Sequence, residues 1–126
     1  ILSMNLSVTT GWTPVWTGDG QLYFSFVKQA APEIILEITF EQNTEAIAEY
    51  DAWLAETARQ VRVKFDGSSA AKYLTLDMAG KWDNFGPTME ERDGNDIVTG
   101  TFRARYNSTA ALFFEAVIGT NLASLP

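Results

Sequence analysis

Hydrophobic and polar residues alternate along most of the chain, which is the pattern of β-strands that bury one face. In residues 34–40, Ile34, Leu36, Ile38 and Phe40 lie on one side of an extended chain, because neighbouring side chains point to opposite faces. About seven or eight such strands predict a mainly β fold, a β-sandwich or split barrel. The other predicted strands cover residues 2–8, 22–27, 61–65, 73–79 with an extension to 85, 89–92, 96–106 and 112–118.

The period changes between residues 44 and 60, where Ile47, Tyr50, Trp53 and Leu54 recur at steps of three and four residues. This spacing places the four side chains on one stripe of an amphipathic helix. We therefore expect one flanking α-helix at roughly 44–60, lying across the sheet with these side chains packed against it.

Asn43 or Thr44 can cap the start of this helix, and Glu45 suits the positive charge of its first turn. Acidic residues lie mostly off the apolar stripe, so we expect Glu45, Glu49 and Glu56 on the outer surface. That surface would face the exterior or a neighbouring subunit and would have no catalytic role.

Residues 11–20 contain three glycines and a proline, which predict a loop, and residues 29–32 predict a turn before the next strand. Trp12 and Trp16 lie in the loop. They either fold back as a lid on the core or contact a partner. We favour the lid, because large aromatic side chains are mostly buried, although interfaces are also enriched in tryptophan.

The composition indicates one globular domain and removes most catalytic chemistry. The 126 residues suffice for a domain with a core, and they include no cysteine and no histidine. Disulfides, thiolate metal sites, histidine general bases and most hydrolase triads are therefore excluded. We expect no enzyme activity, no metal and no cofactor. Because the sequence starts at Ile1 inside a predicted strand, we expect residues 1–126 to be one domain from a longer chain.

The formal net charge is −7 at pH 7. An acidic protein repels phosphate, which argues against a conventional nucleic-acid-binding surface and favours solubility. The sequence has no apolar run near the ~20 residues that a membrane helix needs, so we expect no membrane partner.

Five acidic residues form the only candidate for metal binding or acid–base chemistry. Their spacing lacks the ligand pattern and the closing glutamate of a calcium loop. The Asp93-Gly94 pair between two extended segments predicts a hairpin instead, with the acids around its solvated tip. A glycosidase would need two carboxylates in a cleft, and nothing singles out such a pair. The five residues are Asp83, Glu90, Glu91, Asp93 and Asp96.

Six residues form the candidate interface. Four are aromatic side chains, which bind sugars or anchor proteins where they are exposed, although packing in the core or as a lid is commoner. Two are arginines on one strand face, which we expect to pair with acids on a neighbouring strand or subunit rather than with phosphate. The six are Trp12, Trp16, Trp82, Phe85, Arg103 and Arg105.

An ordered series of stretches is typical of a known family. The most distinctive is residues 93–106, with an acidic-Gly turn, a Val-Thr-Gly-Thr-Phe strand and Tyr106 before the next turn. Asn121-Leu122 after the last strand also fits. From Gly11 onward, the chain resembles a phage major tail tube protein. The earlier stretches are Gly-Trp-Thr-Pro at 11–14, Leu-Tyr-Phe-Ser-Phe at 22–26, Leu-Glu-Ile-Thr-Phe at 36–40, Val-Arg-Val-Lys-Phe-Asp-Gly at 61–67 and Tyr-Leu-Thr-Leu-Asp-Met-Ala-Gly at 73–80.

The resemblance implies a β-sandwich or split barrel flanked by one helix, in subunits that form hexameric rings. The rings would stack into a hollow tube for DNA passage, with an inner wall of strands from neighbouring subunits. The partners would be other copies, other tail proteins, and DNA touched without specific binding, because a negative wall lacks the cations that hold phosphate. The protein would be assembled in the host cytoplasm and reside in the virion tail. The family has no catalytic residues, and the missing start implies an N-terminal arm or domain outside this sequence.

The residues themselves leave a second hypothesis open, a non-catalytic carbohydrate- or protein-binding β-sandwich that uses Trp12, Trp16 or Trp82. An enzyme is the third hypothesis and has the least support. Residues 112–118 carry apolar side chains on both faces, which favours a sheet covered on its second side by more than water. Open strand edges likewise invite pairing with another chain.

Overall fold

The fold is mainly β with one helix against the sheet, as the residue pattern predicts. The computed structural model describes residues 1–18, 20, 22–86 and 90–120. The elements are β1 (Ser3–Thr9), β2 (Trp12–Val15), β3 (Phe26–Gln29), β4 (Glu33–Glu41), α1 (Thr44–Leu54), β5 (Arg59–Asp66), β6 (Tyr73–Phe85), β7 (Glu90–Arg92), β8 (Asn95–Ala104) and β9 (Phe114–Gly119).

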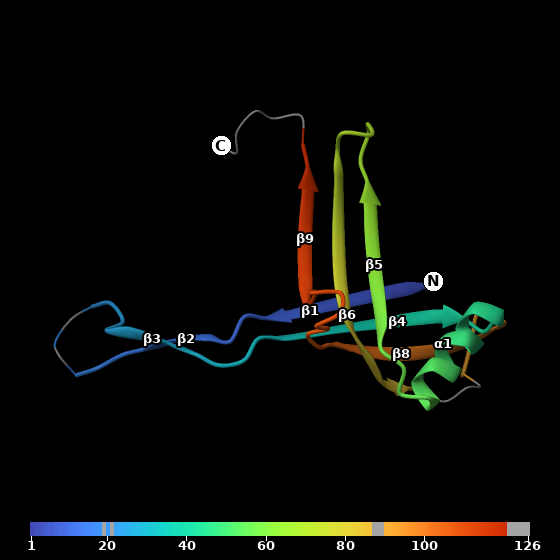
Figure 1. Cartoon of the computed structure of the whole chain (residues 1–126), viewed down its shortest axis with the longest axis horizontal. Coiled ribbons are helices and arrows are strands. Elements are labelled where there is room, and N and C mark those ends of the chain that lie inside the picture. Colours follow the sequence, from blue (N-terminus) through green and yellow to red (C-terminus); the bar gives the residue numbers. More distant parts are fainter. Residues whose placement is uncertain (19, 21, 87–89, 121–126) are drawn as a thin grey trace.

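Seven of these strands form one curled antiparallel sheet, and β2 and β3 form a separate two-stranded ribbon (Figure 1). The long sheet has the order β1-β4-β8-β6-β5, with β7 beside β8 and β9 beside β6. Residues 73–78 of β6 lie between β5 and β9, whereas residues 80–85 pair with β8. In Figure 1, the strands β5, β6 and β9 stand across β1, β4 and β8.

We call β1, β4, β8 and residues 80–85 of β6 the base sheet, and β5, β9 and residues 73–79 of β6 the upright sheet. Strand β6 passes from one to the other at Gly80, which pairs with both β5 and β8. A side chain at Gly80 would collide with the carbonyl oxygen of Arg103, so the approach of the two backbones requires glycine. A register shift between Trp82 and Asn84 follows, and such bulges bend a strand.

The core lies on the inner face of the base sheet, where α1 covers it, and it continues onto the start of the upright sheet. Leu36 of β4 and Phe102 of β8 are fully buried in the base sheet, and Met78 of β6 is fully buried in the upright sheet. An aromatic cluster fills the space beneath the helix, with neighbouring ring centroids 4.9–6.2 Å apart. Its members are Phe40, Tyr50, Trp53, Trp82 and Phe85.

The helix begins where the sequence predicts and ends earlier. Asn43 caps it, since its side-chain oxygen accepts a hydrogen bond from the backbone N–H of Ala46 at 2.9 Å. The prediction of a helix to residue 60 is wrong, because α1 ends at Leu54 and residues 59–60 already belong to β5. Glu56 adopts a left-handed conformation with φ of +50°, which stops the helix before β5 pairs with β6.

The buried stripe of α1 differs from the predicted one. Tyr50 and Trp53 pack against the core as expected, but the buried helix residues are Ala46 and Ala52. The prediction that Ile47 and Leu54 pack on the sheet is wrong, since they are 50% and 60% exposed. Each residue along a helix turns the side chain by about 100°. A buried stripe that is displaced by one or two positions in the sequence therefore faces a different side of the helix.

The prediction that Glu49 lies on the outer surface of the helix is wrong. Its carboxylate accepts a hydrogen bond from the Trp82 indole N–H at 2.8 Å and lies 3.3 Å from the guanidinium of Arg59. A buried indole N–H needs an acceptor, and Glu49 supplies one from the helix above it. Glu45 and Glu56 remain exposed as predicted.

The predicted loop at residues 11–20 is partly wrong, because Trp12–Val15 forms β2. Strand β2 continues from β1, and β3 leads into β4, so one long hairpin is built in two sections. Residues 29–32 therefore do not reverse the chain. The predicted strand at 22–27 is also displaced, since β3 starts at Phe26. Residues Asp19 and Gln21 lie outside the described residues.

The sections join where the backbone N–H of Ala30 donates to the carbonyl oxygen of Gly11 at 2.8 Å. Gly11 has a φ of +76°, and a side chain there would collide with the Ala30 carbonyl oxygen. We call residues 11–30 the arm. It extends away from the base sheet at one end of the molecule (Figure 1).

The Asp93-Gly94 hairpin is confirmed. Both residues have positive φ, +54° and +82°, and they connect β7 to β8 as a two-residue turn. The last strand starts at Phe114 rather than residue 112, because Leu112 forms a bridge with Asn107 just before it. The predicted strand start at Met89 and the tail from residue 121 lie outside the described residues.

The cap of α1 provides a stability test. Asn43→Ala should lower the free energy of unfolding by about 1 kcal/mol, because it removes the acceptor for the Ala46 N–H. Urea denaturation followed by circular dichroism measures this. Asn43→Asp keeps an acceptor and should unfold close to the unchanged protein; equal midpoints for the two variants would show that the cap does not stabilise the fold.

Candidate interaction surfaces

The described residues hold no group of three carboxylates that could bind a metal ion. Glu90, Glu91, Asp93 and Asp96 are exposed around the β7–β8 turn, which confirms the solvated tip. Asp83 lies elsewhere, on β6, where it accepts hydrogen bonds from two arginines. The acidic residues therefore do not converge on one point.

Arg103 and Arg105 pair within the chain, as predicted. Arg103 on β8 donates to Asp83 on β6 and to Glu33 on β4, and Arg105 lies 3.3 Å from Asp83. The hydrogen bond and charge of Asp83, followed by those of Glu33, raise the pKa of Arg103. These cations are matched by carboxylates, so they tie three strands together and do not form a site for phosphate.

Trp82 and Phe85 do not belong to the candidate interface. They are 6% and 5% exposed and sit in the aromatic cluster under α1. The bulge after Trp82 offsets the strand, so that both side chains reach the same core. Both residues therefore pack in the core, which was the alternative to an exposed interface.

Trp12 and Trp16 lie on the arm and are exposed, so the predicted lid on the core is wrong. The arm continues the β1–β4 pair beyond the base sheet and leads away from the core (Figure 1). Trp16 is 62% exposed, and its ring packs edge-to-face on Phe24 with centroids 6.3 Å apart. The other exposed large apolar side chains of the arm are Leu22, Tyr23, Phe26 and Val27.

Beyond Arg59, which pairs with Glu49 of the helix, one face of the upright sheet is made only of apolar side chains. Residues directly opposite each other in antiparallel strands share a face, so the register sets three rows across β5, β6 and β9. Near the base sheet this face joins the core through Met78, while at the far end Ile118 is 70% exposed. The rows are Val61–Met78–Phe114, Val63–Leu76–Ala116 and Phe65–Leu74–Ile118.

The opposite face of the upright sheet is mostly polar. Arg62 makes two parallel hydrogen bonds to Asp77, at 2.7 and 2.8 Å, and Glu115 is the next residue in the row. The hydrogen bond and charge of Arg62 lower the pKa of Asp77. Lys64 and Asp66 of β5 form a further ion pair at 2.8 Å. The two faces therefore differ sharply in polarity.

The edges of the upright sheet are open. Strands β5 and β9 each pair with β6 on one side, and no other described strand pairs with their outer sides. Strand β1 leaves a third open edge on the base sheet. Unpaired backbone N–H and C=O groups along such edges are templates for another strand.

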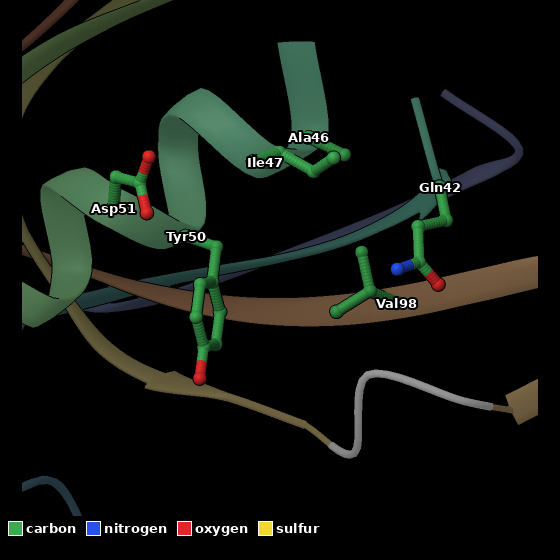
Figure 2. A pocket seen from close by; sticks show the side chains of 6 residues that line it. All are labelled: Gln42, Ala46, Ile47, Tyr50, Asp51 and Val98. Atoms are coloured by element: carbon green, nitrogen blue, oxygen red, sulfur yellow. The ribbon is translucent and has the colours of Figure 1, made fainter. Parts of the chain in front are cut away.

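A hollow beside α1 was not predicted, because Ile47 was assigned to the core. It has a volume of about 280 Å³ and lies between the helix and the start of β8. Figure 2 shows the Tyr50 ring and the Val98 side chain below the helix, with Gln42 at one margin. Ala46 and Val98 are buried within it, whereas Ile47 is exposed at its rim. The sixth residue of its lining is Asp51.

No protein-family model matches the chain, and no curated protein sequence matches it. Among the described residues, the helix is too short and too polar to cross a membrane. Evidence for function therefore comes from the exposed surfaces themselves.

The Arg62–Asp77 pair predicts a pH dependence. Because the pKa of Asp77 is lower in the folded chain than its ordinary value of 3.8, the pair stabilises the fold above that value. This contribution is lost as the pH falls through the lower, folded pKa. Asp77→Asn should therefore be less stable than the unchanged protein at pH 7, and the difference should shrink towards pH 3. Urea denaturation at several pH values measures it.

Glu115→Gln is the matched control, since Glu115 lies in the same row without a hydrogen bond to Arg62. Its stability difference should change less with pH than that of Asp77→Asn. A constant difference between Asp77→Asn and the unchanged protein from pH 7 to pH 3 would contradict the assigned role of the pair.

Proposed function

We propose that this chain is a self-assembling structural protein. The observation that carries the proposal is the upright sheet, which combines an all-apolar face with an open edge on each side. Monomeric soluble proteins rarely expose large contiguous apolar patches, and such patches mark interaction sites. A second copy supplies both a complementary edge and a matching apolar surface.

The strand directions fit addition of copies around an axis. Strands β5 and β9 are both antiparallel to β6, so they run in the same direction. A copy related by rotation about an axis along these strands would place its β9 beside β5 as a parallel pair. The sheet would continue from copy to copy with apolar faces on one side and polar faces on the other. Such a head-to-tail contact closes into a ring where the rotation allows it.

We further propose that these rings are those of a phage tail tube. The resemblance of residues 93–106 and the earlier stretches supports this assignment, as does a mainly β fold with one flanking helix. In a ring of this kind the polar face, with Arg62, Asp77 and Glu115, lines the lumen. The acids match the cations there, and the whole chain is negative, so DNA would pass without being held.

A single substitution on the apolar face tests assembly. Ile118→Glu places a charge at the exposed end of this face and should abolish rings and tubes in electron microscopy and light scattering. Because Ile118 is 70% exposed, the variant should fold, with an unfolding free energy within about 0.5 kcal/mol of the unchanged protein.

Val117→Glu is the matched control. Val117 precedes Ile118 on β9 and lies on the opposite, polar face of the upright sheet, where the substitution should leave most assembly intact. A protein that stays monomeric at high concentration, or equal assembly of Ile118→Glu and the unchanged protein, would refute the proposal.

The exposed tryptophans of the arm support a second candidate, a carbohydrate- or protein-binding module. Trp12 and Trp16 could stack on sugars, and their fluorescence would then shift on addition of glycans. A shift with glycans in a strictly monomeric protein would favour this candidate over self-assembly.

A further inference from the structure

We propose that Lys64 of one copy and Glu115 of the next form an ion pair across the β5–β9 contact, and that these charges select a head-to-tail contact. This inference rests on the proposed self-assembly and names the residues that decide its geometry. The apolar face alone does not distinguish a head-to-tail contact from a two-fold contact, because either one covers apolar side chains with apolar side chains.

The two open edges of the upright sheet carry opposite charges on its polar face. Strands β5 and β9 flank β6 (Figure 1). On β5, the polar face presents the cations Arg62 and Lys64, followed by Asp66. On β9, Glu115 is the sole charged residue. Opposite charges on neighbouring strands stabilise their pairing, so the β9 edge of one copy complements the β5 edge of another.

Glu115 has no ion-pair partner among the described residues of its own chain. It lies directly opposite Asp77, a second acid, while the Arg62 guanidinium makes two parallel hydrogen bonds to Asp77. The Glu115 carboxylate forms no ion pair or hydrogen bond with any described residue. Like charges opposite each other destabilise a sheet, so a cation from outside would relieve the repulsion between Asp77 and Glu115.

Lys64 of a neighbouring copy can supply that cation. Its ion pair with Asp66 spans only two residues of one strand, and the two side chains are 53% and 69% exposed. An exposed ion pair of this kind contributes little stability, so Lys64 can exchange it for another acid. Its ammonium group lies on a long and flexible side chain. Arg62, by contrast, is held by its two hydrogen bonds to Asp77.

The strand register brings the two residues within reach. Arg62 and Glu115 lie in one row across the sheet, and rotation about an axis along the strands keeps this level in the next copy. Glu115 would then lie beside Arg62 and diagonal to Lys64, a separation that long side chains bridge. A slip of one residue would turn Glu115 towards the apolar face, whereas a slip of two residues can place it directly beside Lys64.

Two-fold contacts lack this attraction. Where two β5 edges pair as antiparallel strands with the greatest overlap, Arg62 faces Arg62 or Lys64 of the other copy. Two β9 edges bring no cation to Glu115, because β9 contains none. Like charges that face each other suppress the wrong pairing. The head-to-tail contact is therefore the one that matches the charges of both edges.

Charge reversal tests the ion pair. Lys64→Glu and Glu115→Lys each place like charges on the two edges, so each variant should need at least about 10-fold more protein to form rings in electron microscopy and light scattering. The double variant Lys64→Glu, Glu115→Lys restores opposite charges and should recover most of this loss. Both residues are exposed on edge strands, so all three variants should fold, which circular dichroism checks.

Mixing the double variant with the unchanged protein tests the head-to-tail geometry. In this geometry, each edge of the double variant meets its own charge on the unchanged protein. Differently labelled copies should therefore sort into separate assemblies, with fluorescence energy transfer close to background in the mixture and strong within either protein. A two-fold β5 contact would instead favour the mixed pair, so strong transfer in the mixture would overturn the proposal.

Glu45→Lys is the matched control. It makes the same change of charge as Glu115→Lys, at an exposed residue of α1 that lies outside both edges. This variant should form rings at the same protein concentration as the unchanged protein.

Two further results would overturn the proposal. One is ring formation by Lys64→Glu and Glu115→Lys at the concentration that the unchanged protein needs. The other is a folded double variant that assembles no better than the single variants. The proposed function survives both results if the unchanged protein forms rings and Ile118→Glu blocks them, whereas an unchanged protein that stays monomeric refutes the proposed function and the ion pair together.

Discussion

The close approach of the β6 and β8 backbones at Gly80 sets the shape of the whole molecule. Up to this residue β6 pairs with β9 on one side, and from this residue onward it pairs with β8 instead. Its other side pairs with β5 as far as Gly80. The base sheet can then bury its inner face under α1, and the upright sheet can stand free of it. A larger residue would separate the two backbones and remove the pairing that joins the core to the exposed apolar face. The fold and the proposed assembly surface thus depend on the same contact.

Most strands could be predicted because each alternates with a period of two and has only one possible buried face. The Asp93-Gly94 turn could be predicted because its conformation needs residues that tolerate positive φ. The end of α1 could not. Residues 55–60 continue a helical spacing, and only pairing with β6, distant in sequence, places Arg59 and Gln60 in a strand. Long-range pairing of this kind overrides a local pattern.

The interaction surfaces were harder to predict than the fold. Alternation identifies Ile118 and Leu36 equally well as apolar positions, yet Ile118 is exposed and Leu36 is buried. A sequence reports that a face is apolar, and only the arrangement of the sheets decides whether the same chain covers it. For the same reason Trp16 and Trp82 looked alike, although one lies on the arm and the other donates a hydrogen bond to Glu49 in the core.

The arm has a mechanical consequence, because its two strands lead directly into β1 and β4. A pull on the arm would be carried along β4 into its ladder with β8, where seven residue pairs lie side by side from Ile35 to Glu41. Antiparallel hydrogen bonds run perpendicular to the strands, so a load along β4 shears these bonds together and does not open them one after another. A load applied at the arm therefore meets the sheet in the direction in which its hydrogen bonds resist together.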